Sequence, residues 1–312
     1  MNNLYFSACS DNGGIYHYYF DGKSAPVFEK VYSCPMPMYA IEGANNKLHV
    51  ILRQPFKDDA SGVISYNIGA DGKLANPTEP QSTKGVVACH ITEADGAIYC
   101  VNYLSGSVIK MPDILDVHKG KGVNQPRQDM PHTHYVSPSP DGKYIFVTDL
   151  GIDKIFVYDK DLNVISTTDI PAGHGPRHLA FHEDGKTVFC VNELASTVSV
   201  LKYSDGKLTL IETTGPLAKS ENNTAAAIRV IGNNVFVSHR GDDTVTELVY
   251  DGHLSHLRTY SAYGNGPRDM WVTENMIILT NEKSDNVTFV SRETGELVHE
   301  ISMPTPIGVL CI

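Results

Sequence analysis

A segment of roughly 40 to 50 residues recurs along the chain, and this repeat restricts the fold more than any other feature of the sequence. Each copy contains a short strand-like run, a tight turn, a second apolar run, a polar loop and a third run in which apolar and polar residues alternate. Full copies begin at Ala88, Thr133, Pro176, Ala226 and Pro267, and a weaker copy begins at Pro37. Repeats of this kind are typical of the four-stranded blades of a β-propeller.

Asp-Gly pairs mark the hairpins between these runs. Such a pair between alternating apolar runs is a strong hairpin signal, because the tight turns that join adjacent strands require a positive φ. Between expected first and second strands the chain has Asp95-Gly96, Asp141-Gly142 and Asp184-Gly185. Between expected third and fourth strands it has Asp21-Gly22, Asp71-Gly72, Asp205-Gly206 and Asp251-Gly252.

The two ends of the chain supply the last blade. Residues 306–311 have the pattern of a first strand, and residues 4–9 and 13–20 have the patterns of a second and a third strand. We expect these strands to pair and close the ring, since closure removes exposed sheet edges. The sequence therefore predicts an all-β, seven-bladed propeller with four antiparallel strands per blade, formed by residues 1–312 as one domain. We expect segment 111–131 to be an insertion between blades that carries a short helical turn.

Composition excludes several functional classes. The formal net charge of -11 argues against a general nucleic-acid binder, because such proteins need a basic surface. No apolar run approaches the ~20 residues of a membrane span, and the first residues lack the basic and apolar segments of a signal peptide. The cysteines lack C-x-x-C and zinc spacings, which indicates buried reduced thiols. We expect a cytoplasmic protein without nucleic-acid or membrane partners, as a monomer or weak homo-oligomer.

The repeat predicts where polar side chains gather. In each blade the start of the first strand and the end of the second lie at the same end of the propeller, and the Asp-Gly turns between them lie at the other end. First-strand starts contribute His90, His132, His134, Arg177, His178 and Arg268. Second-strand ends contribute Asp149, Asn192, Glu193, His239, Arg240 and Asn281. This asymmetry indicates one functional face, although a hydrogen bond or ion pair between blades is the competing interpretation for each residue taken alone.

A metal site is the weaker interpretation of these histidines. His132 and His134 are two residues apart, so an extended strand would place both on one side. A zinc ion needs a third and a fourth ligand at fitting distance, and no spacing in the sequence identifies them. We therefore predict neither a metal nor another cofactor.

Four strings of the sequence resemble the lactonase family of seven-bladed propellers, which includes a bacterial 6-phosphogluconolactonase and fungal carboxy-muconate lactonizing enzymes. The strings are PHTHYVSPSPDGKYIFVTDLG, GHGPRHLAFHEDGKTVFCVNEL, VFVSHRGDDTV and GNGPRDM. The resemblance covers about 37–308 and departs from the family at Ser7-Ala8-Cys9, where relatives often have Gly-Thr-Tyr. It implies catalytic roles for His134, Arg177, Glu193 and Arg240. It also suggests that Arg268 binds an anionic group of the substrate, and from their position on the predicted face we expect substrate binding by His90, His132, Asp149, His178, Asn192, His239 and Asn281 as well.

Hydrolysis of a sugar-type lactone is the leading hypothesis, and the resemblance implies 6-phosphogluconolactone as the substrate and 6-phosphogluconate as the product. His134 is favoured as the general base, because an ordinary histidine pKa of about 6.5 lies near neutral pH. Glu193 would then orient water or the imidazole, although either residue can serve as base. Arg177 and Arg240 would stabilise the oxyanion, and guanidinium groups would also bind a phosphate or carboxylate of a small anionic lactone.

Two other functions fit the same residues. A cycloisomerase would use the histidine, glutamate and arginines to open or close a muconolactone without water. A non-catalytic propeller would bind a ligand or a protein, since the fold alone does not imply catalysis. The predicted face is rich in His, Arg, Asn, Asp and Glu rather than aromatic residues, which favours a small polar substrate over a protein partner.

Overall fold

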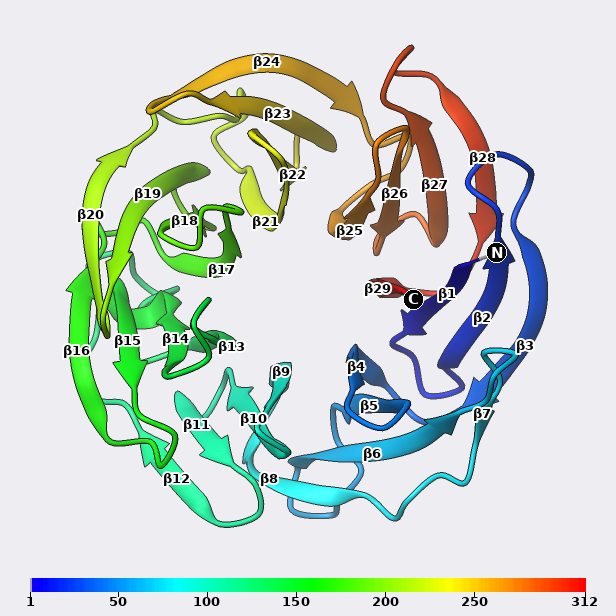
Figure 1. Ribbon diagram of the computed structural model, residues 1–312, viewed down its shortest axis with the longest axis horizontal. Coiled ribbons are helices and arrows are strands. Elements are labelled where there is room, and N and C mark those ends of the chain that lie inside the picture. Colours follow the sequence, from blue (N-terminus) through cyan, green and yellow to red (C-terminus); the bar gives the residue numbers. More distant parts are fainter. Residues whose placement is uncertain (1) are drawn as a thin grey trace.

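The computed structural model describes residues 2–312, which form seven antiparallel sheets arranged around a central axis (Figure 1). One blade consists of β4 (Pro37–Gly43), β5 (Lys47–Leu52), β6 (Ala60–Ile68) and β7 (Leu74–Ala75), with β8 (Gln81–Val86) also paired to β6. The second consists of β9 (Ala88–Ala94), β10 (Ala97–Asn102), β11 (Ser107–Lys110) and β12 (Ile114–Val117). The third consists of β13 (Thr133–Pro138), β14 (Ile145–Asp149), β15 (Lys154–Tyr158) and β16 (Val164–Asp169). The seven-bladed propeller predicted from the repeat is confirmed.

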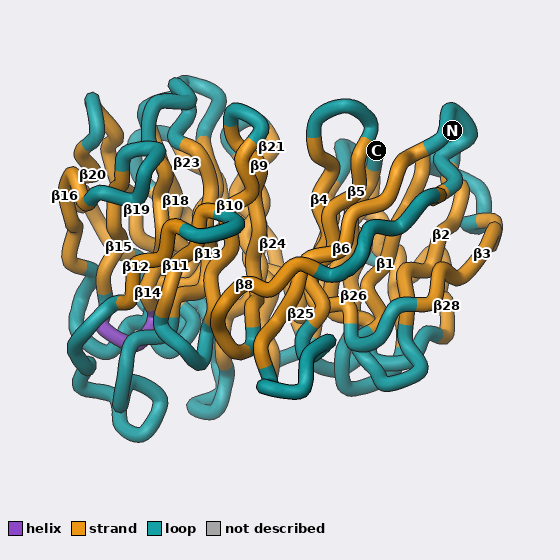
Figure 2. The backbone as a smooth tube through the Cα atoms, turned by 90° about the horizontal axis from the view of Figure 1, so that it is seen from below, coloured by secondary structure: helices purple, strands orange, loops and turns teal. Residues whose placement is uncertain are grey.

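The next three blades continue the same order from the axis outwards. The fourth blade consists of β17 (Pro176–Phe181), β18 (Thr187–Asn192), β19 (Thr197–Ser204) and β20 (Lys207–Thr213). The fifth consists of β21 (Thr224–Ile231), β22 (Asn234–Arg240), β23 (Thr244–Tyr250) and β24 (Leu254–Ser261). The sixth consists of β25 (Pro267–Val272), β26 (Met276–Asn281), β27 (Asn286–Ser291) and β28 (Leu297–Ser302). Residues 2–312 contain no helix with the length and apolar character that a membrane span requires. Figure 2 shows the ring from the side, with the loops gathered at its two ends.

The two chain ends share the last blade, as the sequence predicts. Its strand order is β29 (Pro306–Cys311), β1 (Asn2–Ala8), β2 (Gly14–Phe20) and β3 (Val27–Ser33), so the C-terminal strand is innermost (Figure 1). The ring closes through antiparallel pairing of β29 with β1, in which Phe6 is opposite Val309. This pairing leaves no open edge between the first and last residues of the ring.

The hydrophobic core lies between neighbouring blades. One cluster joins Phe146 and Val157 of one blade to Val188 and Leu201 of the next, and all four side chains are fully buried. Burying a side chain of this size contributes roughly 1.5–3 kcal/mol, so blade-to-blade contacts dominate the stability of the ring. The second strands β14 and β18 are buried along their whole length, because both faces of each sheet pack against neighbouring blades.

Segment 111–131 differs from the prediction. Its first part forms β12, the outermost strand of its blade, so it is not wholly an insertion between blades. The expected helical turn is not found there, and the short 3-10 helix lies instead at Leu150–Ile152. A four-residue edge strand between Pro112 and Gly120 is too short to show the alternation that identifies a strand in sequence. The remainder, 118–131, is a loop at one end of the ring.

A β-bulge near the start of each innermost strand shapes the channel. In β13, Thr133 pairs with Asp149 and Tyr135 with Thr148, so His134 is left without a partner in the ladder. Equivalent shifts occur in the other innermost strands. A bulge redirects the extra side chain away from the face that regular pairing would give it. Six of these extra residues are Met38, Cys89, His134, Arg177, Arg268 and Ile307.

Candidate active site

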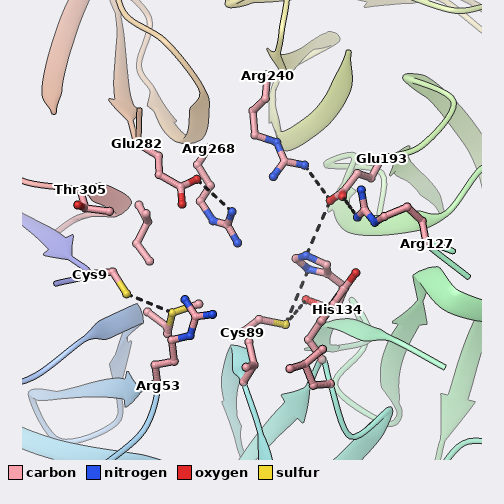
Figure 3. A pocket seen from close by; sticks show the side chains of 15 residues that line it. Cys9, Arg53, Cys89, Arg127, His134, Glu193, Arg240, Arg268, Glu282 and Thr305 are labelled. Carbon is pink, nitrogen blue, oxygen red and sulfur yellow. Dashed lines mark hydrogen bonds and ion pairs between the residues drawn. The ribbon is translucent and has the colours of Figure 1, made fainter. Parts of the chain in front are cut away.

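A pocket of about 370 Å³ lies around the axis at the end of the ring where the bulges occur (Figure 3). Bulge residues form one part of its wall, namely Met38, Cys89, His134, Arg268 and Ile307. Residues at the ends of second strands form another part, namely Cys9, Arg53, Tyr103, Glu193, Arg240 and Glu282. The remaining lining residues are Val87, Leu104, Arg127 and Thr305. Most blades therefore contribute one or two side chains from equivalent positions.

Glu193 is the centre of the charged cluster in this pocket. Its Oε2 accepts a hydrogen bond from Arg177 Nε at 3.0 Å and forms an ion pair with Arg240 Nη2 at 2.9 Å. Its Oε1 accepts a hydrogen bond from Arg127 Nη2 at 2.6 Å. Burial alone raises the pKa of Glu193, but the charges of Arg240 and Arg177 outweigh it and hold the pKa well below its ordinary value. The side chain is therefore a permanent carboxylate near neutral pH, and a poor proton acceptor.

His134 lies between this carboxylate and Cys89. Its Nε2 is 4.0 Å from Glu193 Oε2, and its Nδ1 is 3.9 Å from Cys89 Sγ. Burial and the positive charge of Arg177 lower the pKa of His134 well below 6.5, while Glu193 acts in the opposite direction. The imidazole is thus neutral at neutral pH and can accept a proton. The carboxylate beside it would stabilise the imidazolium that results.

The other pocket arginines differ in depth. Arg240 lines the pocket and also donates to the carbonyl of Ala225 at 3.2 Å. Arg268 lines the pocket and donates to Glu282 Oε2 at 3.2 Å. Arg177 is nearly fully buried and does not line the main pocket; it borders a small adjoining cavity of about 20 Å³ and donates to the carbonyl of Ala226 at 2.7 Å. Arg177 therefore holds Glu193 in place from the buried side, outside the main pocket.

Comparison with known proteins assigns the family. The sequence matches the family described as Lactonase, 7-bladed beta-propeller, over residues 3–311. The chain belongs to this lactonase family. It is 30% identical to the 6-phosphogluconolactonase of Bacillus subtilis over 329 aligned residues, which cover 95% of this chain and 93% of that protein.

Solved structures agree with the lactonase fold. A protein from Lactobacillus plantarum superposes with a TM-score of 0.87 at 28% identity, with all of both chains covered. The periplasmic gluconolactonase of Pseudomonas aeruginosa superposes with a TM-score of 0.88 at 22% identity, covering 100% of this chain and 99% of that one. At that identity, the second likeness shows only that the two proteins share the fold.

The pocket brings together four of the residues that the sequence predicts. His134, Glu193, Arg240 and Arg268 all line it, and the buried Arg177 contacts Glu193. His178 borders the small adjoining cavity with Arg177. These residues come from four different blades, so the ring is what places them within reach of one small molecule.

The second-strand residues Asp149, Asn192, His239 and Asn281 do not line the pocket. Asn192 donates to Thr197 Oγ1 and Ser199 Oγ, both at 2.9 Å, inside its own blade. Asp149, His239 and Asn281 are likewise fully buried and hydrogen-bonded within the sheets and loops. Successive residues of a strand face opposite sides, so the residues that follow Asn192, His239 and Asn281 face the pocket, namely Glu193, Arg240 and Glu282.

His90 and His132 also lie outside the lining of the main pocket. His90 lies deeper in the channel and packs against two tyrosines. The centroid of its ring is 4.5 Å from that of Tyr39 and 4.2 Å from that of Tyr135. His132 stacks on Tyr103 with ring centroids 4.4 Å apart, and its Nδ1 is 3.0 Å from the Tyr103 carbonyl oxygen. His132 and His134 therefore do not form a pair of ligands. Among residues 2–312, no group of three or more His, Cys, Asp or Glu side chains is arranged to hold a metal ion.

Sequence reasoning missed several pocket residues. Arg127 comes from the 118–131 loop, and no motif in that loop indicates that it returns to the centre of the ring. Cys89 was interpreted as a buried core thiol, but it is partly exposed and lines the pocket; burial raises its pKa to about 12. Arg53 could have been found, because it directly follows a second strand, as Glu193 does.

Proposed function

We propose that this lactonase-family protein hydrolyses a sugar-type lactone, with 6-phosphogluconolactone as its substrate and 6-phosphogluconate as its product. The observation that carries the proposal is the neutral imidazole of His134 beside the arginine-bound carboxylate of Glu193, in a pocket whose lining contains Arg53, Arg127, Arg240 and Arg268. Ester hydrolysis needs a proton acceptor for water and a positive group near the carbonyl oxygen. The pocket offers both in one small volume.

In the proposed reaction His134 removes a proton from the attacking water as the water oxygen bonds to the lactone carbonyl carbon. Arg240 stabilises the negative charge that develops on the carbonyl oxygen. The ring C–O bond then breaks, and the imidazolium returns its proton to the leaving ring oxygen, which becomes a hydroxyl group. The product is the open-chain acid, which releases a proton to solvent at neutral pH.

The arrangement favours His134 over Glu193 as the base. A carboxylate that forms ion pairs with three arginines has a low proton affinity, and taking a proton would cost those interactions. Glu193 instead fixes the arginines and stabilises the imidazolium. A positioned general base contributes roughly 10²- to 10⁴-fold, and a well-placed oxyanion donor roughly 10²- to 10³-fold.

The test is a pH-stat assay of acid release from 6-phosphogluconolactone, glucono-δ-lactone and a muconolactone, with the spontaneous rate subtracted. Wild type and the surface control Lys57→Gln should accelerate hydrolysis of 6-phosphogluconolactone, and His134→Asn should lose roughly 100-fold or more of that rate. Circular dichroism would establish that His134→Asn is folded. Absence of acceleration with both sugar lactones would refute the proposal, and conversion of muconolactone alone would indicate a cycloisomerase.

A further inference from the structure

The positive charges of the pocket are unequally compensated. Arg127 and Arg240 share the carboxylate of Glu193, and Arg268 pairs with Glu282. Arg53 also lines the pocket, but its exposed side chain forms no ion pair with a carboxylate of residues 2–312. The lining contains four arginines and two glutamates and no other permanently charged side chain, so its net charge is +2 in a protein whose overall charge is -11. Arg53 holds one of these two uncompensated charges, and the other arises because Arg127 and Arg240 share the single carboxylate of Glu193.

The backbone around Arg53 is held on both sides while its guanidinium is left available. The amide of Arg53 donates to the carbonyl of Met36 at 3.0 Å, and its carbonyl accepts from Ser61 Oγ at 2.6 Å. The neighbouring Cys9 thiol does not supply a negative charge: burial raises its pKa, more than the charge of Arg53 lowers it. The backbone directly after β5 is thus fixed, and the Arg53 side chain lines the pocket without an ion-pair partner among residues 2–312.

Arg53 lies across the pocket from the charged cluster around Glu193. Figure 3 places it on the side of Cys9 and Thr305, whereas Glu193 and Arg127 are on the opposite side and Arg268 lies between the two groups. Thr305 also lines the pocket, and its hydroxyl has no hydrogen-bond partner within residues 2–312. The guanidinium of Arg53 and the hydroxyl of Thr305 therefore border one side of the pocket, and the guanidinium of Arg268 lies between this side and Glu193. Guanidinium groups and hydroxyls are donors that phosphate oxygens accept well.

We propose that Arg53, together with Arg268 and Thr305, forms a subsite for a phosphate monoester and selects phosphorylated over unphosphorylated sugar lactones. This inference rests on the proposed lactonase function, because it assigns the end of the substrate that is distant from the scissile carbonyl. A phosphate monoester carries a charge of about −1.5 to −2 at neutral pH, which matches the excess positive charge of the lining. A sugar lactone with a terminal phosphate would then present its carbonyl to His134 on the other side.

The experiment separates binding from hydrolysis. Isothermal titration calorimetry measures the affinity of 6-phosphogluconate, gluconate and inorganic phosphate for wild type, Arg53→Gln, Arg53→Lys and the control Lys57→Gln, an exposed residue outside the pocket. Wild type and Lys57→Gln should bind 6-phosphogluconate at least tenfold more tightly than gluconate. Arg53→Gln should lose about 10- to 100-fold in affinity for 6-phosphogluconate and little for gluconate, because only the phosphate contact is removed. Arg53→Lys should retain part of the preference.

The outcomes distinguish the subsite from the function. The subsite would be overturned if Arg53→Gln kept the full wild-type preference for 6-phosphogluconate over gluconate. It would also be overturned if wild type showed no such preference, or if wild type bound inorganic phosphate as tightly as 6-phosphogluconate. The hydrolysis assay is run on the same preparations. If wild type hydrolyses 6-phosphogluconolactone but shows one of these results, the subsite is wrong and the lactonase function stands. If it binds with the expected dependence on Arg53 but hydrolyses no lactone, the proposed function is wrong and the phosphate subsite stands.

Discussion

Arg127 Nη2 lies 2.6 Å from Glu193 Oε1, although the two residues are 66 positions apart in the sequence. The arginine belongs to the loop 118–131, and the carboxylate is buried at the end of β18. The same loop is anchored by Gln128, which is fully buried and donates from Nε2 to the carbonyl of Leu150 at 2.8 Å. The loop therefore completes the charged cluster from outside the blades, and its position depends on these two contacts.

Replacing Arg127 with Gln should reduce activity more than stability. Its side chain is 44% exposed, so the ion pair contributes no more than about 1 kcal/mol to the free energy of unfolding. Loss of the contact frees one oxygen of Glu193, and small displacements of catalytic groups cost up to ~100-fold in rate. We expect kcat/KM for lactone hydrolysis to fall roughly 5- to 100-fold, measured beside Lys121→Gln in the same loop. Equal kcat/KM for both variants would show that the contact has no role in catalysis.

Arg240 and Arg177 should differ when each is changed to Gln. Arg240 lines the pocket, so its loss should lower kcat roughly 100- to 1000-fold if it stabilises the oxyanion. Arg177 is 3% exposed and binds Glu193 and the Ala226 carbonyl from behind, so its removal should cost about 3–5 kcal/mol of unfolding free energy. Urea unfolding and single-turnover kinetics of both variants test this. A stable, fully active Arg177→Gln protein would contradict the supporting role.

The free energy of unfolding should decrease as the pH is lowered below 6.5, before carboxylates begin to take up protons. Burial lowers the pKa of His90 to about 3 and that of His239 to about 4, and it holds those of His134 and His178 well below 6.5. A histidine whose pKa is lower in the folded state stabilises the fold above pH 6.5, and this stability is lost as pH falls from 6.5 towards the folded pKa.

Each such histidine should contribute a slope of about 1.4 kcal/mol per pH unit within its window. Urea unfolding between pH 4.5 and 8 measures the total slope. His239→Gln should reduce the slope below pH 6.5 by about 1.4 kcal/mol per pH unit, and the exposed Lys57→Gln serves as the control. A free energy of unfolding that is constant from pH 8 to 5 would contradict the neutral, buried state of these side chains.

The ring and its closure could be predicted from the sequence because both follow from repetition. Asp-Gly turns set the hairpins, and the unmatched strand at residues 306–311 needed a partner that only the N-terminal residues supply. The strand β12 was missed because edge strands are short and half exposed, so they carry little alternating pattern.

The sequence predicted polar side chains at the end of the propeller where the pocket lies, but only some of the predicted residues line that pocket. His134 and Arg268 reach the pocket because bulges redirect them, and bulges leave no clear signal in a single sequence. A shift of one residue along a strand reverses the face, which is why Asn192 is structural and Glu193 is not. Arg127 depends on the path of a loop without repeats, which local patterns do not determine.

The most direct test of the account is the pH dependence of kcat/KM for 6-phosphogluconolactone in wild type, Glu193→Gln and Arg177→Gln, corrected for spontaneous hydrolysis. If His134 is the base, the wild-type rate falls only below pH 6.5, as the imidazole takes up a proton. Arg177 lowers the pKa of His134 and Glu193 raises it, so this acid limb should move to higher pH in Arg177→Gln and to lower pH in Glu193→Gln. An acid limb that stays in place in both variants, or a His134→Asn protein that keeps both the wild-type rate and the limb, would contradict the account.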